Sequence, residues 1–146
     1  MSELNFGNNL LNPTPAGNLS ILQHLIASYK LWHEIKSHIQ KSSRYTLGEK
    51  VDALFVETLE LIFVAQYISK AQKLPALQKA NTKFDALKFF LMILWEVGDL
   101  GQKQYAALSE KFDAIGKMLG GWLRKTEADA ARDASSRAQA TANTKK

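Results

Sequence analysis

The sequence contains no cysteine, which excludes disulfide bonds, thiolate nucleophiles and cysteine-ligated zinc sites. Reducing compartments are the simplest setting for such a chain, so we expect a cytoplasmic protein. Its longest apolar run, Phe89 to Trp95, has seven residues, whereas a helix that spans a bilayer needs roughly 20. The first charged residue of the N-terminus, Glu3, is acidic, and the segment lacks the apolar stretch of a signal peptide. We therefore expect neither a membrane span nor secretion.

The patterns of common catalytic and metal sites are also missing. His33 and His38 in HEIKSH are five residues apart, so their rings would lie about 140° apart around a helix, whereas a zinc-protease helix needs a spacing of four. No histidine follows a glutamate by three residues, as a di-metal bundle requires. Gly120 and Gly121 are not followed by the Lys-Ser/Thr of a phosphate loop, and we interpret them as allowing a neighbouring helix or subunit to approach closely. We expect no enzyme, no metal and no cofactor, although spacing alone does not exclude a Ser/His/Asp triad.

What the chain does have is an excess of positive charge. The net charge is +5, and residues 20–125 contain fifteen Lys/Arg against ten Asp/Glu, so the excess belongs to the central part of the sequence. A basic body favours polyanionic partners, nucleic acid above all, although a solvated surface is the ordinary role of any single lysine.

Composition divides the chain into three parts. Residues 1–18 contain Asn, Pro and Gly without periodicity and read as a flexible leader. Residues 126–146 have no apolar residue larger than alanine, which predicts a disordered tail or a frayed helix. The intervening residues 19–125 form one domain.

Four helical segments are predicted in this domain, at about 20–39, 46–70, 75–97 and 99–124. Apolar residues recur in each with a seven-residue period. Thr46 with Glu49, in TLGE, and Asp99 with Gln102, in DLGQ, predict capping boxes, and Pro75 fits a first helical turn. The links KAQKL and GDLG are short, so neighbouring helices should be antiparallel. The predicted fold is an all-α, up-down-up-down four-helix bundle.

The run KFFLMILWEV contains more apolar residues than one buried face needs. Leu87, Leu91 and Leu94 should face the protomer core, and LIFVA at residues 61–65 shows a similar excess. Large exposed apolar patches mark interfaces, so we expect the surplus residues to be covered by another subunit. The alternative is that the helix is wrapped by its own three neighbours. The predicted oligomer-interface residues are Phe89, Phe90, Met92, Ile93 and Trp95.

Basic residues near the second helical link and the end of the fourth segment should gather in an antiparallel bundle. Arg44 and Tyr45 are ambiguous, because the aromatic ring could stack on bases or pack as an N-terminal staple. The candidate nucleic-acid-binding residues are Lys70, Lys73, Lys79, Lys83, Lys88, Arg124 and Lys125.

Three segments together resemble a known family. They are RYTLGEKVDALFVETLELI, KLPALQKANTKFDALKFFLMILWEV and KQYAALSEKFDAIGKMLGGWLRK, and the ending GKMLGGWLRK is the most specific. They resemble the Avd-type proteins, the accessory variability determinants of diversity-generating retroelements, which are distantly related to ribosomal-RNA intervening-sequence proteins. The resemblance implies a homopentamer of four-helix protomers that binds the reverse transcriptase of the retroelement and RNA or DNA, without being the polymerase. Within the matched segments lie Lys83, Lys88, Arg124 and Lys125.

Two classes of function follow from these observations. The first is a nucleic-acid-binding and reverse-transcriptase-binding accessory subunit of a retroelement. The second is a structural or protein-interaction bundle whose charges serve only solubility.

Overall fold

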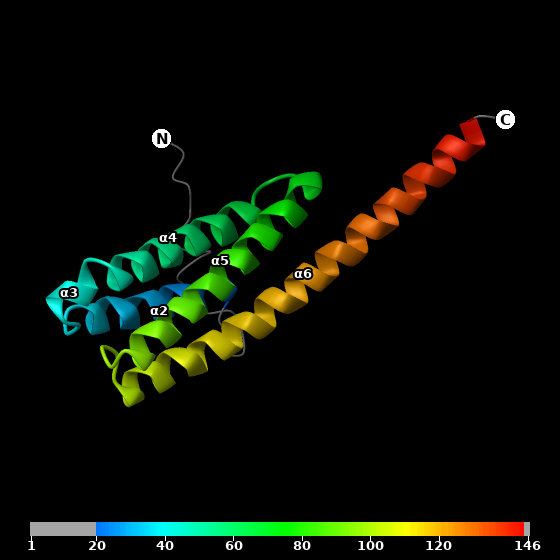
Figure 1. Cartoon of the computed structure of the whole chain (residues 1–146). Helices are drawn as coiled ribbons and strands as arrows, with labels where there is room; N and C mark the ends of the chain where they lie inside the picture. Colours follow the sequence, from blue (N-terminus) through cyan, green and yellow to red (C-terminus); the bar gives the residue numbers. More distant parts are fainter. Residues whose placement is uncertain (1–19, 145–146) are drawn as a thin grey trace, which may run out of the picture.

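A computed structural model of the chain describes residues 20–144, which form four long helices and one short helix (Figure 1). Within this range there is no β-strand. The elements are α2 (Ile21–Lys36), α3 (Lys41–Arg44), α4 (Leu47–Ala65), α5 (Lys70–Glu96) and α6 (Gln102–Thr144). The prediction of an all-helical bundle is therefore confirmed. The predicted leader, residues 1–18, lies outside the described residues.

The four long helices pack around one core. Helix α4 makes its most extensive contacts with α5, α5 also contacts α6, and α2 contacts both α4 and α6. Each long helix thus packs against two others, and the core lies between all four. The predicted inward face of α5 is confirmed, because Leu87, Leu91 and Leu94 are at most 1% exposed.

A chain of aromatic rings crosses the middle of this core and joins all four long helices. Trp32 of α2 stacks on Phe55 of α4, and Phe55 packs against Phe112 of α6 at a centroid distance of 5.6 Å. Phe112 in turn meets Phe84 of α5 edge to face at 5.3 Å. All four side chains are at most 4% exposed. Such pairs contribute about 0.5–1.5 kcal/mol each beyond the burial of apolar area, so this cluster helps to fix how the helices pack against one another.

The helix caps differ from the predicted ones. The capping box of the structure lies at the start of α2, where the Gln23 amide donates to Ser20 Oγ and the Ser20 amide donates to Gln23 Oε1. Thr46 does occupy the N-cap position of α4, but its hydroxyl donates to the Ser42 carbonyl at 3.1 Å, so the predicted box with Glu49 is wrong. The reason is α3, whose terminal carbonyls lie within reach of the Thr46 hydroxyl.

The second predicted capping box is also wrong. Helix α6 begins at Gln102 rather than after Asp99, and the Asp99 carboxylate accepts a hydrogen bond from the Ser43 hydroxyl. Gln102 instead accepts from the Trp95 indole N–H. Asp99 and Gln102 therefore form hydrogen bonds with residues of other elements instead of the predicted capping box.

Helix α5 begins five residues earlier than predicted. Residues 70–74, expected to be the link, form the first turn of the helix, and the link is Gln66–Ser69. Pro75 consequently lies inside the helix. Proline has no amide N–H, so the helix lacks the backbone hydrogen bond that residue 75 would otherwise donate to the carbonyl of Ala71. At the other end, Gly98 has a φ of 86°, a left-handed conformation that suits glycine after a helix.

Helix α6 continues to Thr144, where a disordered tail or a frayed helix is expected from Thr126 onward. Its 43 residues correspond to a length of about 65 Å, and Figure 1 shows its last part projecting beyond the other helices. Alanine has the highest helix propensity of all residues, so an alanine-rich segment can extend a helix that the bundle has already nucleated. Low hydrophobicity had suggested disorder, but it did not prevent continuation of the helix.

Candidate functional site

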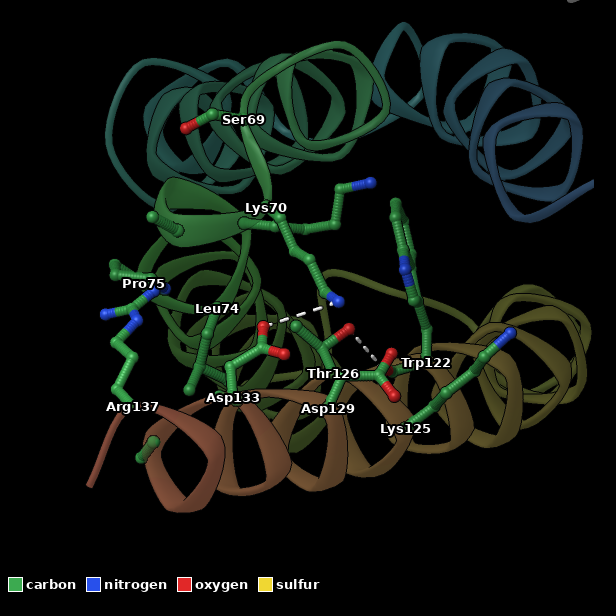
Figure 2. Close-up of a pocket in the computed structure, with 14 residues that line it drawn as sticks. Ser69, Lys70, Leu74, Pro75, Trp122, Lys125, Thr126, Asp129, Asp133 and Arg137 are labelled. Atoms are coloured by element: carbon green, nitrogen blue, oxygen red, sulfur yellow. Dashed lines mark hydrogen bonds and ion pairs between the residues drawn. The ribbon is translucent and has the colours of Figure 1, made fainter. Parts of the chain in front are cut away.

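The start of α5 and the second half of α6 enclose a cleft of about 910 Å³ at one end of the bundle (Figure 2). We call it the α5–α6 cleft. Its lining includes the indole of Trp122 and the side chain of Leu74. The charged residues that line it are Lys70, Lys73, Lys125, Asp129, Asp133 and Arg137.

Three of the charges that line this cleft are compensated by ion pairs. Lys70 Nζ lies 3.3 Å from Asp133, which joins the start of α5 to the extended part of α6, and Asp129 pairs with Arg132 on α6. No such pair is present within residues 20–144 for the other cations of the lining, which are Lys73, Lys125 and Arg137. The lining of the α5–α6 cleft therefore carries a net positive charge.

Helix periodicity explains why the cleft is polar. The α6 residues that face the bundle core are Leu108, Phe112, Ile115 and Leu119, and their spacing of four and three continues through Trp122, Thr126, Asp129 and Asp133. Thr126 is only 8% exposed, and its hydroxyl donates to the Trp122 carbonyl at 2.8 Å. Beyond Thr126 the same face of α6 presents the carboxylates of Asp129 and Asp133 to the cleft. The inward face of α6 thus changes from apolar to charged where the bundle core ends.

A second, smaller cleft of about 440 Å³ lies between α5 and α6 nearer the middle of the bundle. Lys88, Lys117 and Arg124 line it together with Asp113. Lys88 is held 3.2 Å from Asp85 and lies over the ring of Phe84, 5.1 Å from its centroid.

The seven predicted nucleic-acid-binding residues are divided between different surroundings. Three of them, Lys70, Lys73 and Lys125, line the α5–α6 cleft, as expected from the packing of the end of one helix near the start of another. Lys88 and Arg124 line the smaller cleft. The remaining two are not in either group, because Lys83 pairs with Glu57 of α4 at 3.0 Å and Lys79 is exposed on α5.

Sequence reasoning missed two cations of these clefts. Lys117 lies within the matched ending GKMLGGWLRK, seven residues before Arg124, and this spacing places both on one face of a helix. Arg137 lay in the segment assigned to the tail, but it follows Asp133 by four residues, and this spacing indicates a shared face once the helix is extended.

The five predicted interface residues differ in exposure. Phe89 is 51% exposed, whereas Phe90 and Trp95 pack partly against the core of their own protomer. The Trp95 ring stacks on Tyr105 at 4.8 Å, and Lys50 of α4 lies over Phe90. The other two, Met92 and Ile93, are half-buried. Large exposed apolar side chains elsewhere in the described part of the chain are Tyr45, Val56, Val64, Tyr67 and Val97.

Arg44 and Tyr45, ambiguous in the sequence, have distinct positions. The Arg44 guanidinium donates to the carbonyls of Ser37 and Ile39, both at 3.0 Å, and so connects the end of α2 to α3. Tyr45 is 57% exposed. Arg44 therefore has a structural role in the protomer.

A polar cluster between α2 and α4 is centred on one carboxylate. Asp52 Oδ1 accepts hydrogen bonds from the Tyr29 hydroxyl at 3.0 Å and from the Trp32 indole N–H at 3.3 Å, and Lys36 Nζ lies 3.7 Å away. Burial, together with the hydrogen bond to Asp52 and the charge of that carboxylate, raises the pKa of Tyr29 above its ordinary value. This cluster stabilises the packing of α2 on α4.

Three further features bear on function. A Cβ added to Gly121 would meet no atom within 4 Å, so no other helix of this protomer packs closely on that glycine in the part the structure describes. Among residues 20–144, no three His, Asp or Glu side chains are grouped so as to hold a metal ion. None of the helices in that range is both long enough and apolar enough to cross a bilayer.

Comparison with known proteins agrees with this description of the bundle. No curated protein matches the chain. The family model of bAvd-like proteins matches residues 20–126, which cover all of the bundle and end where α6 begins to extend beyond it. Because the match covers well over half of the sequence, the chain belongs to the bAvd-like family.

Proposed function

We propose that the chain is an accessory subunit of a diversity-generating retroelement that binds the reverse transcriptase of that element, together with its template RNA or cDNA. The observation that supports this most strongly is the family match over the whole bundle, because the bAvd-like family suggests an Avd accessory protein. This family is an accessory, non-catalytic type of protein.

The distribution of charge supports the nucleic-acid part of the proposal. Residues 20–125 hold fifteen Lys/Arg against ten Asp/Glu, and basic side chains line both clefts between α5 and α6. Lys117 and Arg124 form no ion pair within the described residues and are exposed to solvent. Exposed cations that form no ion pair are available to phosphates.

We also propose that the four long helices alternate in direction, up-down-up-down, and that the protomer assembles into a cytoplasmic homopentamer. Short links between α4 and α5 and between α5 and α6 support the alternation. Exposed apolar residues on α4 and α5, among them Val56, Tyr67 and Phe89, support assembly. The number five comes from the resemblance to Avd-type proteins.

Binding of labelled RNA and DNA across a salt titration tests the nucleic-acid role. We expect the affinity to fall steeply with salt, because each neutralised phosphate releases counterions. The variant Lys117→Glu/Arg124→Glu should bind more weakly than Lys41→Glu/Lys103→Glu, which makes the same charge change at exposed positions outside both clefts. Undetectable binding at low salt would contradict the proposal.

Co-purification with a reverse transcriptase encoded beside the gene tests the partner. If the chain is instead a structural bundle, replacement of Lys79, Lys83, Arg124 and Lys125 by Glu will leave every partner interaction intact. A neighbouring reverse-transcriptase gene with a template repeat supports the accessory role, and its absence counts against it.

A further inference from the structure

We infer that the α5–α6 cleft binds single-stranded nucleic acid, with one base against Trp122 and the adjoining phosphates on Lys73, Lys125 and Arg137, and that Asp133 competes with this ligand for Lys70. This inference rests on the proposed nucleic-acid role and names a ligand class, a site and a mode of regulation for it. Five of the fourteen residues that line the cleft lie beyond residue 126, where the family match ends.

The charges of the cleft favour an anionic ligand. Within residues 20–144, its two carboxylates already have cationic partners, Asp133 with Lys70 and Asp129 with Arg132, whereas Lys73, Lys125 and Arg137 form no ion pair. Unpaired cations around one hollow favour a ligand with several negative charges, which a nucleic-acid backbone supplies.

The aromatic side chain of Trp122 favours a ligand that contains a nucleic-acid base. Figure 2 shows the indole of Trp122 standing on the α6 side of the cleft, opposite the side chain of Lys70. Trp122 is only partly buried and lines the hollow. Proteins that bind single strands combine a basic groove with aromatic rings on which bases stack, and the face of a base is accessible in this way when it is not stacked within a duplex. The combination therefore favours a single strand over a double helix.

In the ion pair between Lys70 and Asp133, the carboxylate competes with an anionic ligand for the lysine. The two paired atoms are 3.3 Å apart, and the side chains are 67% and 41% exposed, so solvent screens the pair and a phosphate can displace the carboxylate. In the unbound protein Asp133 is thus paired with Lys70, a cation that a phosphate would otherwise contact. Removal of the carboxylate should release Lys70 to the ligand.

The main test measures binding of a labelled single-stranded oligouridylate to the full chain and to Asp133→Asn. We expect Asp133→Asn to bind roughly two- to fivefold more tightly, the range that an exposed ion pair represents. The matched control is Glu110→Gln, which removes the same charge from an exposed position of α6 that lines neither cleft. Its affinity for the oligouridylate should be closer to that of the unaltered chain. Both positions are at least partly exposed, so neither variant should unfold.

Two further variants separate the contributions of base and phosphate. Trp122→Leu should weaken binding of the single strand roughly tenfold with little change in the salt slope, because it removes stacking. Lys125→Gln should lower the slope by about 0.7, the value for one phosphate contact of a single strand. A blunt duplex of the same length should be insensitive to Trp122→Leu. Circular dichroism checks that each variant is folded.

The outcomes distinguish the two proposals. If the unaltered chain binds the oligonucleotide but Asp133→Asn and Trp122→Leu bind it equally well, the cleft is not the site and only this inference is wrong. A response of duplex and single strand to Trp122→Leu by the same factor also overturns it. If the unaltered chain binds no nucleic acid at low salt, the proposed function fails as well.

Discussion

At the scale of single residues, Asp52 shows how one carboxylate can connect two helices. It accepts from Tyr29 and Trp32 of α2, although its own helix is α4. Trp32 is completely buried, so its indole N–H needs an acceptor inside the protein. Leu25, Trp32 and Ile39 recur at a seven-residue spacing in the sequence, but this pattern gives no indication of which acceptor the indole N–H meets.

Tyr29→Phe should lower the free energy of unfolding by about 1 kcal/mol at neutral pH, because it removes a hydrogen bond to Asp52. The pKa of Tyr29 is raised in the folded protein, so its stabilisation is complete below pH 10. Above pH 10 the unfolded chain loses the phenol proton first, and the contribution falls as the pH rises through the folded pKa. The difference between variant and unaltered chain should therefore shrink above pH 10.

Urea unfolding of both chains over this pH range measures the difference. Tyr45→Phe is the matched control, because Tyr45 is 57% exposed, and it should have little effect at neutral pH. A difference between Tyr29→Phe and the unaltered chain that grows above pH 10 would contradict the assigned direction of the pKa shift.

At the scale of elements, α6 has two parts with different origins of stability. Up to Thr126 its inward face is buried in the bundle, whereas among residues 127–144 only Asp129 and Asp133 are as much as half-buried. The first part is held by tertiary packing. The second depends on helix propensity, on i,i+3 pairing of Asp129 with Arg132 and on the ion pair to Lys70.

A chain that ends at Glu127 should therefore keep a bundle of nearly unchanged stability. We expect a loss of less than about 1 kcal/mol, since the only ion pair from the extension to the bundle in the described residues is the exposed Lys70–Asp133 pair. Circular dichroism should show less helix per molecule, and the urea midpoint should barely move. A large drop in the midpoint would show that the extension stabilises the bundle through contacts beyond this pair.

The positions of the helices were largely predictable from heptad spacing, but their ends were not. Thr46 and Asp99 are predicted as capping residues, but their side chains form hydrogen bonds to other elements. A local sequence pattern does not predict such contacts. The extension of α6 was misjudged for another reason. Its seven-residue spacing does continue through Thr126, Asp129 and Asp133, but with polar residues, and hydropathy alone conceals such a continuation.

At the scale of the whole molecule, α5 exposes apolar surface that another subunit would cover in the predicted oligomer. Phe89 is the sharpest probe of assembly, because at 51% exposure it contributes less to its own core than Phe90 or Trp95 does. We expect Phe89→Glu to give a smaller species in sedimentation experiments without loss of helix. A buried interfacial charge without a partner costs several kcal/mol, on the order of what a stable contact supplies.

Thr82→Glu is the control for this experiment. It introduces the same charge seven residues earlier on the same face of α5, at an exposed polar position. Its assembly should match that of the unaltered chain. An oligomer that survives Phe89→Glu would remove Phe89 from the predicted interface, and a chain that is monomeric without substitution would remove the interface altogether.

The sequence by itself determined the helical class, the inward positions of α5 and the basic character of the bundle, because helix periodicity and net charge are local or additive properties. Only the tertiary structure decided which cations lie together and which are paired. Lys83 meets Glu57 and Lys70 meets Asp133 across helices, whereas Lys73, Lys125 and Arg137 line one cleft. Such neighbours depend on how the helices pack, and packing is set by the shapes of buried side chains, which a pattern of apolar positions does not specify.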